Sequence, residues 1–149
     1  MGLVPTAVTV VTAPGPDGPS GATANAVVSL SLEPPLMLAA LDRRSRTLAS
    51  LRSAGAFGVS VLSAGQDELA HRFATKDPHP VKWDGVAWRE LAGVPAIEGA
   101  TVSIACSLRD LLEGGDHAIV TGEVAGIEIA DEAEPLVFSR GEYRPLPRP

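Results

Sequence analysis

The sequence predicts a mainly β protein, a barrel of roughly seven strands into which two helices are inserted. Short runs of β-branched residues recur between turns rich in glycine and proline, and one long stretch alternates apolar and polar residues. Only two segments have the spacing of an amphipathic helix. We expect residues 1–149 to form a single domain that is large enough to bury a core, with a mobile tail from about residue 145.

The first half of the chain is expected to be strand-rich. Ala7 to Thr12 is a β-branched strand, and the proline- and glycine-rich residues 13–20 form a hairpin loop. In residues 21–32 every second side chain is apolar, which predicts one strand with its apolar face in the core. Its other face carries only small polar groups and is either a solvated sheet face or a platform for a flat ring. After Glu33-Pro34-Pro35, residues 36–41 predict a fully buried strand.

A helix is expected over residues 45–54. Ser45 is a good N-cap, Leu48 and Leu51 share a face, and Gly55 supplies the stop. Arg44, Arg46 and Thr47 surround the start of this helix, where free N–H groups and the helix dipole favour a phosphate. An ordinary capped surface helix is the alternative. Residues 64–75 predict the second helix.

The second half begins with a buried strand over residues 57–62. Residues 76–88 form an irregular loop with both tryptophans, which either covers a pocket or plugs a barrel end. Residues 100–112 and 117–129 predict two long strands joined by a glycine-rich hairpin turn. A short strand at 135–139 and the Arg140-Gly141 turn follow, and Tyr143 begins the tail.

Composition excludes several classes of function. The net charge of −6 argues against nucleic-acid binding, and a single cysteine, Cys106, excludes an intrachain disulfide or a multi-thiolate zinc site. The three histidines lack metal-ligand spacing, and no apolar run has the length of a membrane span. No secretory signal is visible, so we expect a cytoplasmic protein without a membrane partner. No nucleophile–base pair stands out, which favours chemistry that a cofactor supplies.

His117, which follows Gly114-Gly115-Asp116, is either a structural residue or one that faces a second ligand, because the glycines beside it leave space. The chain resembles the flavin reductases that supply reduced flavin to two-component monooxygenases, a branch of the FMN-binding split barrels. The resemblance covers nearly the whole chain in the expected order. The matching segments are Pro5–Thr12, Ala22–Asn25, Ser29–Pro35, Asp42-Arg43, Ser45–Thr47, Phe57–Leu62, Gly115–His117 and Arg140–Tyr143.

The resemblance implies a homodimeric split β-barrel of Greek-key type that transfers a hydride from NADH or NADPH to FMN or FAD. It also implies a transient monooxygenase partner that receives the reduced flavin. His117 is implied to be catalytic and, with Tyr143, to receive the nicotinamide. The residues implied to bind the flavin are Thr23, Ala24, Asn25, Ala26, Asp42, Ser45, Thr47 and Lys82, with Ser45 and Thr47 at its phosphate.

The chain departs from the usual pattern of this family at four positions. Ala26 replaces a hydroxyl residue, Val27 and Val28 replace a larger aromatic and a threonine, and Ser60 replaces an asparagine. These changes motivate an alternative function, a flavin-binding carrier or sensor without reductase activity. A purely structural dimerisation module is the third hypothesis, and it predicts no affinity for flavin.

Overall fold

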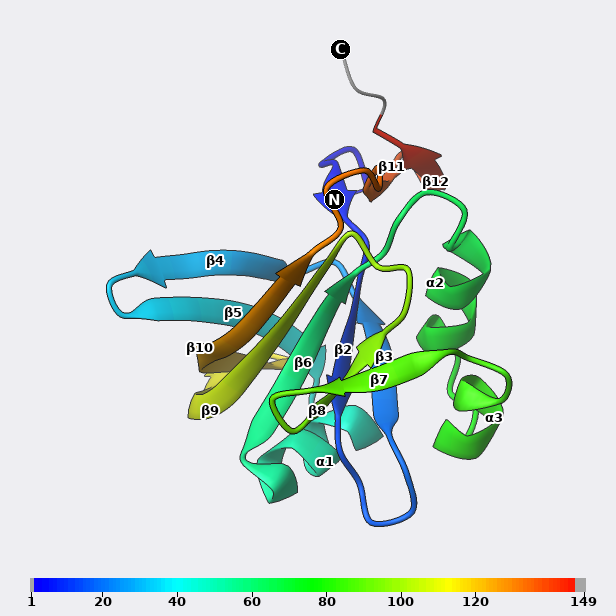
Figure 1. The fold of residues 1–149 in the computed structure, drawn as a ribbon. Helices are drawn as coiled ribbons and strands as arrows, with labels where there is room; N and C mark the ends of the chain where they lie inside the picture. The colour runs from blue at the N-terminus through cyan, green and yellow to red at the C-terminus, as the bar shows by residue number, and fades with distance from the viewer. Residues whose placement is uncertain (1, 147–149) are drawn as a thin grey trace.

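A computed structural model of the protein describes residues 2–146, which contain twelve strands and three helices (Figure 1). In chain order the elements are β1 (Thr6–Ala7), β2 (Thr9–Ala13), β3 (Ser20–Ala24), β4 (Val27–Leu32), β5 (Pro35–Asp42), α1 (Arg46–Ala54), β6 (Ala56–Val61), α2 (Asp67–Ala74), α3 (His79–Trp83), β7 (Trp88–Leu91), β8 (Val94–Ile97), β9 (Val102–Gly114), β10 (His117–Ile129), β11 (Leu136–Ser139) and β12 (Glu142–Pro145).

Seven strands form the main antiparallel sheet, in the order β3-β2-β6-β9-β10-β5-β4. The two outer strands, β3 and β4, are not paired with each other, so the sheet is not closed. A small sheet of order β1-β11-β12 and the β7–β8 hairpin complete the strands within residues 2–146. The β9–β10 hairpin connects the two halves of the main sheet, because β9 pairs with β6 and β10 pairs with β5.

Two clusters of buried apolar side chains hold the helices against the sheets. In the first, Leu48 and Leu51 of α1 pack with Phe57 and Val120 of the main sheet. In the second, Phe73 of α2 packs with strand residues and with the first tryptophan of the chain. Full burial of one such large apolar side chain stabilises the fold by about 1.5–3 kcal/mol. Packing therefore fixes where the N-terminus of α1 and the end of α2 lie.

The expected first helix and the long hairpin are confirmed. Ser45 caps α1 by accepting a hydrogen bond from the Leu48 N–H, and Gly55 ends the helix in the left-handed conformation, with a φ of 67°. The strand expected over residues 117–129 is β10, and its turn lies at Gly115-Asp116.

The continuous strand expected over residues 21–32 is wrong. The chain forms β3 and β4 there, which pair with β2 and β5 at opposite edges of the main sheet. The break falls at Asn25 and Ala26, and the Ala40 N–H donates to the Ala26 carbonyl to hold it beside β5. Alternation of apolar and polar residues continues through the break, and for this reason the pattern did not reveal it.

The apolar side chains of β4 that were expected to lie in the core are exposed. Val28, Leu30 and Leu32 are 54%, 47% and 89% exposed, because β4 is an outer strand that pairs only with β5. The β4–β5 ribbon, called the arm below, projects at one side of the molecule (Figure 1), while β5 stays paired with β10. The strand expected to be fully buried at residues 36–41 is also only partly covered. Within it, Ala39 and Leu41 are buried, whereas the other four residues keep some exposure.

Several boundaries differ from expectation in the second half. The helix expected over residues 64–75 is the shorter α2, and the loop expected to be irregular contains α3. Pro78 and Pro80 at the start of α3 are the helix-start signal that the sequence analysis missed. Tyr143 lies inside β12, where it pairs with Phe138, rather than at the start of a tail. Of the expected tail, residues 147–149 lie outside the part of the chain that the structure describes.

Within residues 2–146, none of the helices has both the length and the apolar character needed to cross a membrane. These residues also contain no group of three or more His, Cys, Asp or Glu side chains placed to hold a metal ion.

Candidate functional site

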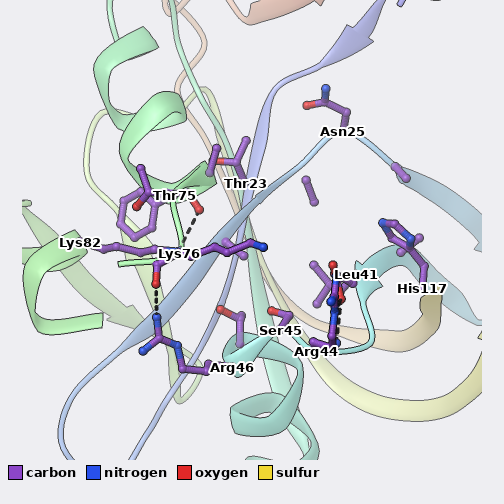
Figure 2. Close-up of a pocket in the computed structure, with 18 of the residues that line it drawn as sticks. Thr23, Asn25, Leu41, Arg44, Ser45, Arg46, Thr75, Lys76, Lys82 and His117 are labelled. Atoms are coloured by element: carbon purple, nitrogen blue, oxygen red, sulfur yellow. Dashed lines mark hydrogen bonds and ion pairs between the residues drawn. The ribbon is translucent and has the colours of Figure 1, made fainter. Parts of the chain in front are cut away.

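One cavity of about 850 Å³ collects all the residues that the sequence analysis named for a site. It is bounded by the break between β3 and β4, the N-terminus of α1, the segment from the end of α2 into α3, and the start of β10 (Figure 2). The expected residues on its wall are Thr23, Ala24, Asn25, Ala26, Asp42, Ser45, Thr47, Lys82, His117 and Tyr143. The fold thus brings them together, whereas the role of each remains a prediction.

The break between β3 and β4 supplies a wall of short side chains. Thr23 is tied to α2, because its hydroxyl donates to the Ala70 carbonyl at 2.7 Å. The Asn25 Oδ1 is buried and has no hydrogen-bond partner among the described residues. Ala24 and Ala26 add no bulk, so backbone groups are approachable along this edge. These features fit a flat polar ring that is held by its edge.

The N-terminus of α1 has the properties of an anion site. The first turn of a helix leaves its N–H groups without partners in the helix, and the helix dipole adds positive potential there. The first turn of α1 contains no acidic residue. Thr47 is only 1% exposed, and its Oγ1 is buried without a partner within residues 2–146. Buried hydroxyls without a partner are rare, so a ligand oxygen is the best explanation for the missing partner of the Thr47 hydroxyl.

Positively charged side chains surround this helix end. Arg44, Arg46, Lys76 and Lys82 all line the cavity, and Asp42 is the one carboxylate among its described lining residues. Lys82 is buried, and its Nζ donates to the Phe73 carbonyl at 3.1 Å and to the Gly21 carbonyl at 3.4 Å. Burial lowers the pKa of Lys82, and the nearby Arg46 lowers it further. The wall therefore favours an anion.

Arg46 links α1 to the segment between α2 and α3. Its Nη2 donates to the carbonyls of Lys76 and Asp77, at 2.6 and 2.7 Å, and Figure 2 shows the first of these contacts. This link holds the start of α3 close to the helix N-terminus, although the two elements are distant in sequence. The residues that the sequence analysis missed, Thr75, Lys76 and His79, lie in this segment.

His117 lies at the start of β10, on the other side of the cavity from Lys82 in the view of Figure 2. Its Nδ1 is 2.7 Å from Asp116 Oδ1, which leaves Nε2 as the nitrogen free for a ligand. This hydrogen bond lowers the pKa of Asp116, so the carboxylate stays charged and orients the imidazole. Asp42 pairs with His117 in the β5–β10 register, and the Arg44 N–H lowers the pKa of Asp42.

Tyr143 reaches the cavity from β12. Its ring stands edge-on to His71, with the ring centroids 4.7 Å apart, and is tilted against Phe138 at 5.3 Å. Burial raises the pKa of the Tyr143 hydroxyl, which stays protonated near neutral pH. The aromatic packing fixes Tyr143 against the same space that His117 borders, so the two side chains offer one apolar and one polar contact to a ring.

Comparison with known proteins identifies the architecture and the family. The model of the family described as "Flavin reductase like domain" matches residues 1–147. The "NADH-dependent FAD reductase" of Streptomyces globisporus is 40% identical over 148 residues, which cover 97% of this chain and 81% of the relative. The "Flavin-dependent monooxygenase, reductase subunit HsaB" of Rhodococcus jostii is 36% identical over 144 residues, covering 96% and 73% of the two chains.

A solved structure extends this likeness to the fold. It is the NADH:FAD oxidoreductase SgcE6 of Streptomyces globisporus C-1027 in complex with NAD and FAD fragments. Its TM-score is 0.89 at 39% sequence identity, and the alignment covers 96% of this chain and 86% of that one. The expected mainly β fold is therefore confirmed, with three helices in place of two.

Proposed function

The chain belongs to the flavin reductase-like domain family, and we propose that it is an NAD(P)H:flavin oxidoreductase that supplies reduced flavin to a monooxygenase. One observation carries the proposal. A single cavity combines an edge of short side chains, a helix N-terminus beside a buried hydroxyl that has no partner within residues 2–146, and the side chains of His117 and Tyr143. These three features match the ring, the phosphate and the second ring that the reaction has to bring together.

The cavity fits FMN or FAD. Ser45 and Thr47 hold the phosphate at the N-terminus of α1, and the basic side chains around them offset its charge. Thr23, Ala24, Asn25 and Ala26 would edge the isoalloxazine ring, where the buried Asn25 Oδ1, which has no partner within residues 2–146, could accept a hydrogen bond. Asp42, which pairs with His117 in the β5–β10 register, and Lys82 line the same cavity and would complete the flavin contacts.

His117 and Tyr143 receive the nicotinamide of NADH or NADPH. When bound, the flavin supplies a ring that accepts a hydride at N5. The contribution of the protein is positioning, because hydride transfer needs reacting atoms about 3–3.5 Å apart in stacked rings. The His117 Nε2 orients the nicotinamide, the Asp116 carboxylate fixes the imidazole, and Tyr143 excludes water from one side of the cavity.

The β4–β5 arm supports the proposal that the protein is a homodimer. It presents the exposed apolar side chains Val28, Leu30 and Leu32 along an outer strand of the main sheet. An exposed apolar strand at a sheet edge is a liability that a partner chain removes. The arm begins at Ala26, directly beside the cavity, so a second copy packed on it lies close to the flavin site. A monooxygenase that receives the reduced flavin is the transient partner.

The test is anaerobic oxidation of NADH and NADPH by the purified protein with FMN or FAD added, followed by the absorbance of the reduced nicotinamide. We expect flavin-dependent turnover. If flavin binds, as shown by quenching of its fluorescence, but no nicotinamide is oxidised, the carrier or sensor function replaces this proposal. If flavin does not bind at all, the protein is a structural module and the reductase function is wrong.

A further inference from the structure

His79 is a histidine of the cavity wall to which the proposed reaction assigns no role. It is the first residue of α3 and lines the cavity. Both of its ring nitrogens are buried, and neither has a hydrogen-bond partner within residues 2–146. A neutral imidazole carries one N–H donor and one acceptor nitrogen, so both capacities are unused. Among the described residues, seven buried side-chain polar atoms have no partner, and four of them belong to Asn25, Thr47 and His79, which all line this cavity.

The two charges that shift the pKa of His79 are both positive. Lys82 lies one turn further along α3, and Arg46 reaches the same place from α1. Burial lowers the pKa of His79 from its ordinary value of 6.5, and the charges of Lys82 and then Arg46 lower it further. Without an anion in the cavity, the imidazole is therefore neutral at pH 7.

Two strands contact α3. The sequence of β3, SGATA, has no titratable side chain, whereas β7, which reaches Trp83 through the ring of Trp88, has the sequence WREL with one arginine and one glutamate. The carboxylate that acts on Lys82 is that of Asp77, which raises the pKa of Lys82 against the two lowering effects. In the segment before α3, the Asp77 carboxylate accepts a hydrogen bond from the Thr75 hydroxyl at 2.8 Å, and Lys76 adds a further positive charge to the cavity wall. From α2, Arg72 donates to the Asp84 carbonyl at the far end of α3.

A phosphate in the cavity reverses this balance. An anion at the N-terminus of α1 lies within the same wall as Arg46, Lys82 and His79, and its charge favours the protonated imidazole. We propose that His79 takes up a proton when a phosphate-bearing flavin binds, so that His79 couples flavin affinity to pH. This inference rests on the proposed function, because it requires a flavin in the cavity.

The sign of the effect follows from linkage. Flavin binding raises the pKa of His79 above its lowered value in the free protein. Affinity therefore increases as the pH falls through the pKa of the bound state, and it stops increasing below the pKa of the free state. A rise of one pKa unit on binding corresponds to about a tenfold higher affinity at the low-pH limit.

FAD is the suitable probe. A phosphate monoester such as that of FMN has a second pKa of about 6, and it binds more tightly as it becomes a dianion at higher pH. That titration opposes the proposed effect. The diphosphate of FAD has no comparable ionisation near neutral pH, so proton uptake on FAD binding reports the protein.

The experiment is calorimetric titration of FAD into the protein at about pH 7, in two buffers with different heats of ionisation. The difference in observed heat gives the number of protons taken up. The chain has three histidines, His71, His79 and His117, and each is replaced by glutamine in turn. We expect proton uptake in the wild type and in the His71→Gln and His117→Gln variants, and its loss in His79→Gln.

A second variant keeps the test independent of any effect on folding. His79→Arg carries a permanent charge, so its FAD affinity should remain constant between about pH 6 and about pH 8, whereas that of the wild type falls. Proton uptake that persists in His79→Gln overturns the inference, as does FAD binding to the wild type without proton uptake. Both of these outcomes leave the reductase function standing. A wild-type protein that binds no FAD overturns both proposals.

Discussion

The Thr47 hydroxyl allows a decisive test of the phosphate site. In the Thr47→Val variant the side chain keeps its shape and its β-branched stiffness but loses Oγ1. That atom is buried in the structure and has no partner within residues 2–146, so its removal breaks no internal hydrogen bond. Because an unsatisfied buried polar group costs about 1–3 kcal/mol, the variant should be at least as stable as the wild type.

The effect on binding should have the opposite sign. A hydrogen bond to a charged group contributes about 1.5–3 kcal/mol, so its loss should raise the Kd for flavin by about 10- to 150-fold. The Kd is measured by the quenching of flavin fluorescence, and stability by thermal unfolding without ligand. The two measurements distinguish a ligand contact from a structural role. If Thr47 had only a structural role, Thr47→Val would lower stability and leave the Kd nearly constant.

Thr101 provides the matched control. Its Oγ1 is also buried without a partner among the described residues, but Thr101 does not line the cavity. The Thr101→Val variant should therefore reproduce the effect on stability without any change in the flavin Kd. A Thr47→Val variant that binds flavin as tightly as the wild type would refute the assignment of α1 as the phosphate site.

The remaining predictions concern hydride transfer, assembly and burial. His117→Ala should slow nicotinamide oxidation by at least about tenfold, which corresponds to a loss of about 1.4 kcal/mol of transition-state stabilisation. The flavin Kd should stay nearly constant, and unchanged turnover would exclude His117 from the reaction. Leu32→Asp should shift the protein from dimer to monomer in light scattering, whereas Leu3→Asp, at a site 74% exposed outside the arm, should not; a monomeric wild type contradicts the proposed dimer. Burial raises the pKa of the Cys106 thiol to about 12, so it is protonated at pH 8 and should react with a disulfide reagent only after unfolding. Rapid reaction of the native protein would show that Cys106 is not in the core.

Local signals in the sequence were sufficient for some elements. The Ser45 cap and the Gly55 stop set the ends of α1 through contacts within a few residues, and the turn before His117 closed its hairpin at the expected place. The end of the strand at Asn25 has no such signal, because the alternation of apolar and polar residues passes through it. The break arises because β3 pairs with β2 and β4 pairs with β5, toward opposite edges of the main sheet. This choice of partners is a property of the whole fold.

Part of the site could not be predicted for the same reason, because it depends on contacts between distant segments. Sequence reasoning named the anion site from α1 alone, whereas His79 and Lys76 join it from a segment about thirty residues further along the chain. The link between them is the guanidinium of Arg46 bound to two backbone carbonyls. Backbone acceptors have no signature in the side-chain pattern, so such a contact is visible only after the chain has folded.

The break at Asn25 and Ala26 divides what the sequence predicts as one strand into two strands with different surroundings. On its N-terminal side, β3 places short side chains along the cavity, and on its C-terminal side, β4 forms the opposite edge of the sheet, where its apolar side chains are exposed. The Ala26 carbonyl, bound to the Ala40 N–H at 2.8 Å, holds the start of β4 to β5, whereas β3 pairs with β2. A continuous strand could not do both, because β2 and β5 lie toward opposite edges of the main sheet. The same two residues that end the pairing of β3 therefore separate the strand proposed to edge the flavin from the strand proposed to meet a second copy.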